Sequence, residues 1–126
     1  MRLRRGIVVG IVLLLYATVS AAASEPKRVL ILDSFGRDFA PWSEYARDIR
    51  EDLVRLSPEP IDLYEASLAT ARFAGDQQEG PFVDYLRALF AGHQLDLVIT
   101  IGAPAAGFVQ RYRRQLFPST PMLYTA

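Results

Sequence analysis

The sequence predicts an α/β fold: a three-layer, Rossmann-like half in which a mainly parallel sheet lies between helices. Apolar runs of strand length alternate with segments of helical period, as in successive βαβ units. Two of these runs, 29–32 and 97–99, are continuously apolar, which is typical of parallel strands covered on both faces. A chain of 126 residues, 51% hydrophobic and 22% charged, has the size and composition of about one folded domain.

Four strands are expected. Residues 29–32 and 97–99 form the central pair, whereas residues 61–65 alternate in polarity after Pro60 and therefore belong to an edge strand. Residues 122–124 are the fourth strand, beside the third. With short, right-handed connections the predicted strand order is 2-1-3-4, half of a doubly wound sheet.

Three helices are expected to cover this sheet with apolar stripes. The first stripe contains Trp42, Tyr45, Ala46, Ile49, Leu53 and Leu56, with the charged residues 47, 48 and 50–52 on the opposite face. The second helix starts near Pro81 or, with Asp76 and Glu79 as a capping box, one turn earlier, and stops at Gly92. Its inward residues are Phe82, Val83, Leu86, Leu89 and Phe90. The third helix opens with Pro104, ends before Pro118 and directs inward Ala105, Phe108, Val109, Tyr112 and Leu116.

Residues 1–23 have the pattern of a signal peptide. A basic stretch (1–5) precedes an apolar run (6–19) and three alanines (21–23) before Ser24. As a helix the apolar run would be only ~21 Å long, short of the ~30 Å hydrocarbon core of a bilayer. We therefore expect an exported, periplasmic protein whose folded part covers residues 24–126, with an uncleaved N-terminal membrane anchor as the alternative. The absence of cysteine excludes disulfides and thiolate chemistry and suits a bacterial periplasm.

The charge balance argues against nucleic acid as a partner. Fourteen basic residues match fourteen acidic ones, but three of the basic residues (Arg2, Arg4 and Arg5) lie in the predicted signal peptide, which leaves eleven against fourteen. A mildly acidic domain does not attract phosphates.

Ligands of open α/β sheets bind beyond the carboxyl ends of the strands, where the winding direction changes. Here that point lies between the first and third strands, and the loops that reach it are 33–36 and 102–105. The predicted ligand-binding residues are Ser34, Phe35, Gly102, Ala103 and Ala105. The alternative is that Ser34 and Gly102 only form tight turns.

The connection 67–78 is long for this kind of fold, and long loops are often functional. Within it, Arg72 and Phe73 are possible contacts. Phe73 either closes over a ligand or, as we favour, fixes the loop to the domain, and Arg72 is a candidate partner for a carboxylate.

The sequence gives little support to catalysis. Gly102 and Gly107 lack the lysine and hydroxyl of a phosphate-binding loop, and His93 is the only histidine, so no metal site or cofactor is expected. A triad of Ser34, His93 and an aspartate would combine elements from opposite ends of the sheet. We therefore predict a binding module that is not an enzyme, with a secreted serine hydrolase as the rival from another class.

Four segments together resemble a known family: 29–36 (VLILDSFG), 39–42 (FAPW), 68–73 (LATARF) and 96–106 (DLVITIGAPAA). They are similar to the first lobe of ABC-transporter substrate-binding proteins of the type I periplasmic-binding-protein fold, as found in the extracytoplasmic sensor region of bacterial membrane histidine kinases. The resemblance implies two lobes joined by a hinge, with a small ligand in the cleft. Ala69 stands where similar sequences often have an acidic residue, which weakens a charge-paired role for Arg72.

The resemblance also implies an incomplete first lobe, an N-terminal fragment, because the family continues beyond Ala126 into further strands and a second lobe. The parent protein would serve a membrane transporter or, alternatively, be a truncated histidine-kinase sensor. The edge strand 122–124 is apolar and is expected to allow self-association.

Overall fold

The computed structural model describes residues 22–69 and 79–125. Nearly all of the predicted signal peptide, together with Arg72, Phe73 and Asp76, therefore lies outside the described residues. The chain forms, in order, β1 (Lys27–Asp33), α2 (Trp42–Leu56), β2 (Ile61–Ser67), α3 (Glu79–Leu89), β3 (Leu97–Ile101), α4 (Ala103–Leu116) and β4 (Met122–Thr125). This alternation confirms the predicted α/β class.

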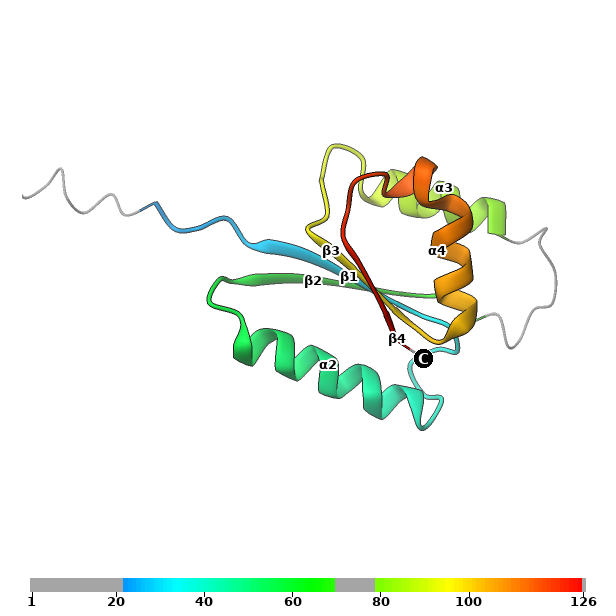
Figure 1. Ribbon diagram of the computed structural model, residues 1–126, viewed down its shortest axis with the longest axis horizontal. Coiled ribbons are helices and arrows are strands. Elements are labelled where there is room, and N and C mark those ends of the chain that lie inside the picture. Colours follow the sequence, from blue (N-terminus) through cyan, green and yellow to red (C-terminus); the bar gives the residue numbers. More distant parts are fainter. Residues whose placement is uncertain (1–21, 70–78, 126) are drawn as a thin grey trace, which may run out of the picture.

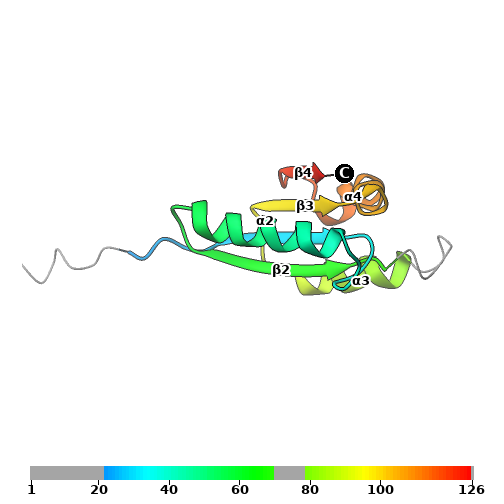
Figure 2. The same cartoon turned by 90° about the horizontal axis from the view of Figure 1, so that it is seen from below.

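The strands form one parallel sheet in the order β2-β1-β3-β4, as predicted (Figure 2). β1 lies in the centre, with Ile31 level with Glu65 of β2 and with Ile99 of β3. Among the described strands, β2 and β4 are the two edges, and β4 pairs with β3.

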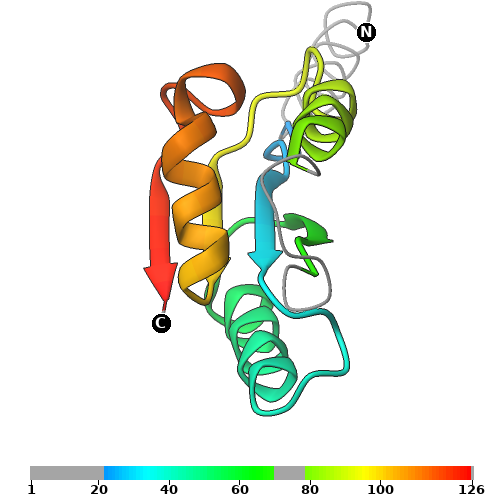
Figure 3. The same cartoon turned by 90° about the vertical axis from the view of Figure 1, so that its right-hand side faces the viewer.

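The helices divide unequally between the two faces of the sheet. Figure 1 shows α2 on one face and both α3 and α4 on the other. Right-handed crossovers explain this division, because the step from β1 to β2 and the later steps toward β4 run in opposite directions across the sheet. Among the described residues, one face is thus covered by two helices and the other by α2, while β4 lies at the outer edge (Figure 3).

The strand residues alternate between two apolar clusters, as expected for a sheet covered on both sides. Leu30, Leu32 and Val98 belong to the cluster under α3 and α4, which is centred on the fully buried Phe108. Val29, Ile31, Ile99 and Ile101 form the cluster under α2.

The predicted stripe of α2 is correct along its centre but too broad. Trp42, Ala46, Ile49 and Leu53 pack against the sheet. Tyr45, beside the stripe, and Leu56, the last residue of the helix, are 44% and 66% exposed. In the part of the chain that the structure describes, no second helix lies beside α2 to cover its flanks.

The last residue of α3 differs from expectation, whereas its start near Pro81 does not. Within the described residues the helix begins at Glu79, with Pro81 in its first turn, where a proline removes no intrahelical hydrogen bond. Leu89, predicted to point inward, is the last residue of α3 and is exposed. Gly92 has the positive φ, 73°, expected of the glycine that ends a helix.

Candidate functional site

The turn after β1 is tied to the start of α4 by the side chain of Ser34. Ser34 is 1% exposed, and its hydroxyl donates a hydrogen bond to the carbonyl oxygen of Ile101 (2.7 Å). The hydroxyl oxygen of Ser34 in turn accepts the backbone N–H of Ala105 (2.9 Å), a donor in the first turn of α4. Ser34 thus caps a helix that begins about seventy residues later in the chain.

Gly102, immediately before α4, is required by this arrangement. Its φ of 88° disfavours any residue with a side chain. A Cβ at this position would lie 2.7 Å from Oγ of Ser34 and 3.1 Å from the ring of Phe35. The positive φ and the close contacts together make glycine the residue that fits at this position.

The structure brings most of the predicted site residues together around this turn. The backbone N–H of Ala105 is occupied by Ser34, and Ala103 is exposed on the first turn of α4. Phe35 packs against Phe39 and Trp42, with ring centroids 5.4 and 5.7 Å apart. A ligand role for these residues stays a prediction, and the two remaining candidates, Arg72 and Phe73, lie outside the described residues.

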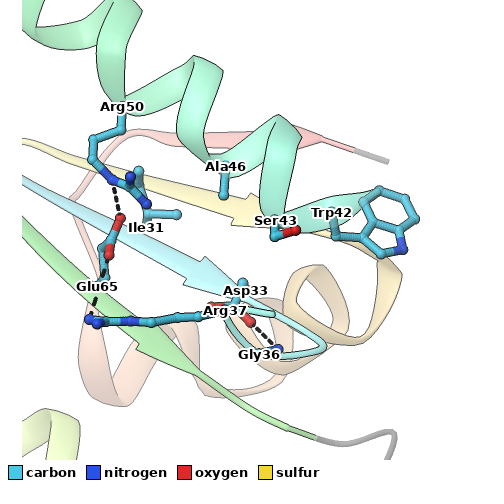
Figure 4. Close-up of a pocket in the computed structure, with 9 residues that line it drawn as sticks. All are labelled: Ile31, Asp33, Gly36, Arg37, Trp42, Ser43, Ala46, Arg50 and Glu65. Carbon is cyan, nitrogen blue, oxygen red and sulfur yellow. Dashed lines mark hydrogen bonds and ion pairs between the residues drawn. The ribbon is translucent and has the colours of Figure 1, made fainter. Parts of the chain in front are cut away.

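A cavity of about 430 Å³ lies beside this turn, between the first half of α2 and the carboxyl ends of β1 and β2 (Figure 4). Its lining consists of Ile31, Asp33, Gly36, Arg37, Trp42, Ser43, Ala46, Arg50 and Glu65. We call it the α2 cavity. Its volume is in the range of small-molecule sites.

Two arginines converge on one carboxylate in the α2 cavity. Nε of Arg50 lies 2.6 Å from Oε1 of Glu65, and a guanidinium nitrogen of Arg37 lies 3.6 Å from the other carboxylate oxygen (Figure 4). The side chain of Glu65 is 21% exposed and that of Arg37 is 77% exposed. An arginine has five N–H donors, so most of the donors in this cluster are available to a further acceptor.

The second carboxylate of the cavity belongs to Asp33, at the end of β1. Its Oδ1 accepts the backbone N–H of Gly36 (2.6 Å) and the hydroxyl of Ser67 (2.7 Å). Within the described part of the chain, Oδ2 accepts no hydrogen bond. One carboxylate oxygen of Asp33 therefore stabilises the loop after β1, and the other is available to accept a hydrogen bond in the cavity.

Strand alternation explains why these groups share one face. On β1, Asp33 follows Ile31 on the α2 side of the sheet, and on β2, Glu65 follows Leu63 on the same side. Each strand thus changes from apolar to acidic on that face as it nears its carboxyl end. The cavity was not expected from the sequence, because the helical period places Arg50 on the solvent face of its helix. That assignment is wrong, since the side chain reaches back to Glu65 on the sheet.

A second cavity, of about 250 Å³, adjoins the first at the carboxyl edge. It is lined by Phe35, Gly36, Arg37, Asp38, Phe39, Ser67 and Ala69. Ala69 has an unusual positive φ of 49° immediately before the segment that the structure does not describe. Arg37 and Gly36 line both cavities, so the β1–α2 loop separates them.

The histidine needed for a serine triad lies at the other end of the molecule. Ser34 follows the carboxyl end of β1, whereas His93 precedes the amino end of the parallel neighbour β3. Five strand residues at ~3.3 Å each separate the two levels, which excludes a hydrogen bond between them. Among the described residues there is also no group of histidines and carboxylates that could hold a metal ion.

Outside the cavity, the side chain of Tyr64 has a shifted pKa. The hydroxyl of Tyr64 donates a hydrogen bond to Asp62 (2.9 Å) two residues earlier on β2. This hydrogen bond is the main reason why the pKa of Tyr64 lies above its ordinary value of 10.0. Tyr64 packs with the α3–α4 cluster, on the opposite face of the sheet from the α2 cavity.

Within the described residues, no helix is both long enough and apolar enough to span a membrane. Comparison with known proteins adds no relative: no protein-family model matches the sequence, and no curated protein or solved structure is significantly similar to it.

Proposed function

We propose that this protein is an exported small-ligand-binding lobe, of the kind that serves an ABC transporter as its substrate-binding protein. The observation that carries the proposal is the α2 cavity, which lies at the carboxyl ends of β1 and β2 and next to the loop at the β1–β3 switch point. Ligands of open parallel sheets bind at this end. A membrane histidine-kinase sensor domain is the alternative that shares the same binding chemistry.

Binding without catalysis is favoured by how the polar groups are used. The hydroxyl of Ser34 is buried and donates to a backbone carbonyl, an arrangement that opposes nucleophilic attack. Glu65 of the cavity instead pairs with Arg50 and Arg37, and Arg37 remains largely open to solvent. Such groups recognise and orient a ligand.

The proposal extends to export and to a partner lobe. Export rests on the signal-peptide pattern of residues 1–23. A second lobe closing over the carboxyl edge would add contacts to a ligand that one lobe holds only from one side. We accordingly expect the single lobe to bind weakly.

The uncovered edge of the sheet supports the proposed self-association. Leu123 and Tyr124 on β4 are 50% and 44% exposed, and the strand contains no charged residue. Uncharged, apolar edges of this kind allow pairing with a second copy.

The direct test is isothermal titration calorimetry of the full chain against a chemically diverse set of small metabolites. We expect at least one compound to bind saturably, and more tightly once a second lobe is supplied. Failure of every compound would contradict the proposal. Stoichiometric labelling of Ser34 by a serine-directed fluorophosphonate would instead establish the hydrolase alternative.

Export has a separate test. N-terminal sequencing of the protein from a periplasmic fraction should give Ser24 as the first residue. Membrane-bound protein that retains Met1 would support the anchor instead.

A further inference from the structure

The α2 cavity carries both signs of charge, which narrows the class of ligand. Arg37 and Arg50 contribute two positive charges, and Asp33 and Glu65 contribute two negative charges. A dianion would meet two carboxylates, and a cation would meet two guanidinium groups. A ligand with one charge of each sign avoids both repulsions.

The two signs are also separated within the cavity. Glu65 is level with Ile31 of β1, so Asp33 lies two residues, or roughly 7 Å, further along the strands. Glu65 is already engaged by both arginines, whereas Oδ2 of Asp33 has no partner among the described residues. The cavity therefore presents a free carboxylate oxygen at one side and guanidinium donors at the other (Figure 4).

We propose that the α2 cavity binds a small zwitterion of the amino-acid type, an inference that rests on the proposed binding function. The ammonium group of the ligand is held by Asp33, and its carboxylate by the free N–H donors of Arg50 and Arg37. Ala46, which is partly exposed, gives the remainder of the ligand a small apolar surface. Hydrogen bonds between charged groups are about twice as strong as neutral ones, so this cavity favours a zwitterion over a neutral sugar.

The ligand test uses matched compounds. The twenty standard L-amino acids are titrated singly into the full chain by calorimetry. Each amino acid that binds is then compared with two analogues, one without the amino group and one without the carboxylate; for L-leucine these are 4-methylpentanoate and 3-methylbutylamine. We expect at least one amino acid to bind and both of its analogues to bind at least about tenfold more weakly. Equal binding of a carboxylate-only or amine-only analogue overturns the inference.

Substitutions in the cavity test which residue binds the ammonium group of the ligand and which binds its carboxylate. Asp33→Asn keeps an oxygen that can accept from Gly36 and Ser67 but removes the charge, so it should weaken amino-acid binding about tenfold while the fold persists. Arg37→Gln, at an exposed side chain, should weaken it as well. Arg47→Gln is the matched control, because Arg47 lies on α2 and pairs with Asp48 rather than with the cavity. Unchanged affinity in Asp33→Asn overturns the proposed ammonium contact.

The same titrations distinguish failure of the zwitterion inference from failure of the proposed binding function. If no amino acid binds but D-ribose or another metabolite does, the zwitterion inference is wrong and the binding function is retained. If no compound of any class binds, both are wrong.

Discussion

Replacing Ser34 by alanine tests whether this residue acts as a structural cap. The carbonyl oxygen of Ile101 keeps a partner in Ser34→Ala, because the backbone N–H of Ser34 also donates to it (3.1 Å). The N–H of Ala105 loses its acceptor inside a core where Ala105 is fully buried. One unsatisfied buried donor costs about 1–3 kcal/mol, and lost helix caps cost about 0.5–2 kcal/mol.

We therefore expect Ser34→Ala to lower the free energy of unfolding by about 2 kcal/mol, which corresponds to a Tm decrease of roughly 10 °C for a domain of this size. Chemical denaturation followed by circular dichroism measures the first quantity and calorimetry the second. Ser119→Ala, at an exposed loop serine, is the control and should change stability by less than about 0.5 kcal/mol. An unchanged Tm combined with lost ligand binding would refute the structural role and restore the predicted ligand contact.

Three further outcomes are expected. Gly102→Ala should destabilise the fold by more than about 1 kcal/mol, because it adds a methyl group beside Ser34 at a positive φ; denaturant titration measures this, and a neutral result would contradict the turn geometry. Thr100→Val should raise the Tm, since the fully buried hydroxyl of Thr100 has no hydrogen-bond partner within the described residues, and a lower Tm would show that it has one. Asp62→Asn should lower the pKa of Tyr64 toward 10.0 in an ultraviolet titration, because the carboxylate that stabilises the protonated phenol is gone. Since that pKa is raised in the folded protein, the stability that this hydrogen bond adds is present below pH 10.0 and is lost at higher pH. A pKa that does not move would exclude the Asp62 hydrogen bond as the cause.

The sequence was sufficient for the sheet because continuous apolar runs identify its central strands. Residues 29–32 and 97–99 are buried between two layers, and strand order then follows from short, right-handed connections. The burial of residues at the ends of the helices was less predictable. Leu56 and Leu89 continue apolar stripes in the sequence, yet each ends its helix and is exposed.

The candidate site was predictable only in part. Ser34 and Gly102 follow adjacent strands, so their proximity could be deduced, but whether the serine contacts a ligand or a helix depends on atomic distances. Arg50 has the helical position of a solvent residue. Its long side chain nevertheless reaches Glu65 on β2, a pairing that depends on how α2 sits across the sheet.

The central claim, that a small ligand occupies the α2 cavity, is tested most directly by a ¹H–¹⁵N NMR titration of the full chain with the compound that binds most tightly in calorimetry. We predict saturable shifts of the backbone amides of Gly36, Arg37 and Ala46, with little change at Gln94 near the opposite end of the sheet. Shifts confined to residues outside the cavity, or the absence of any saturable shift, would contradict the claim.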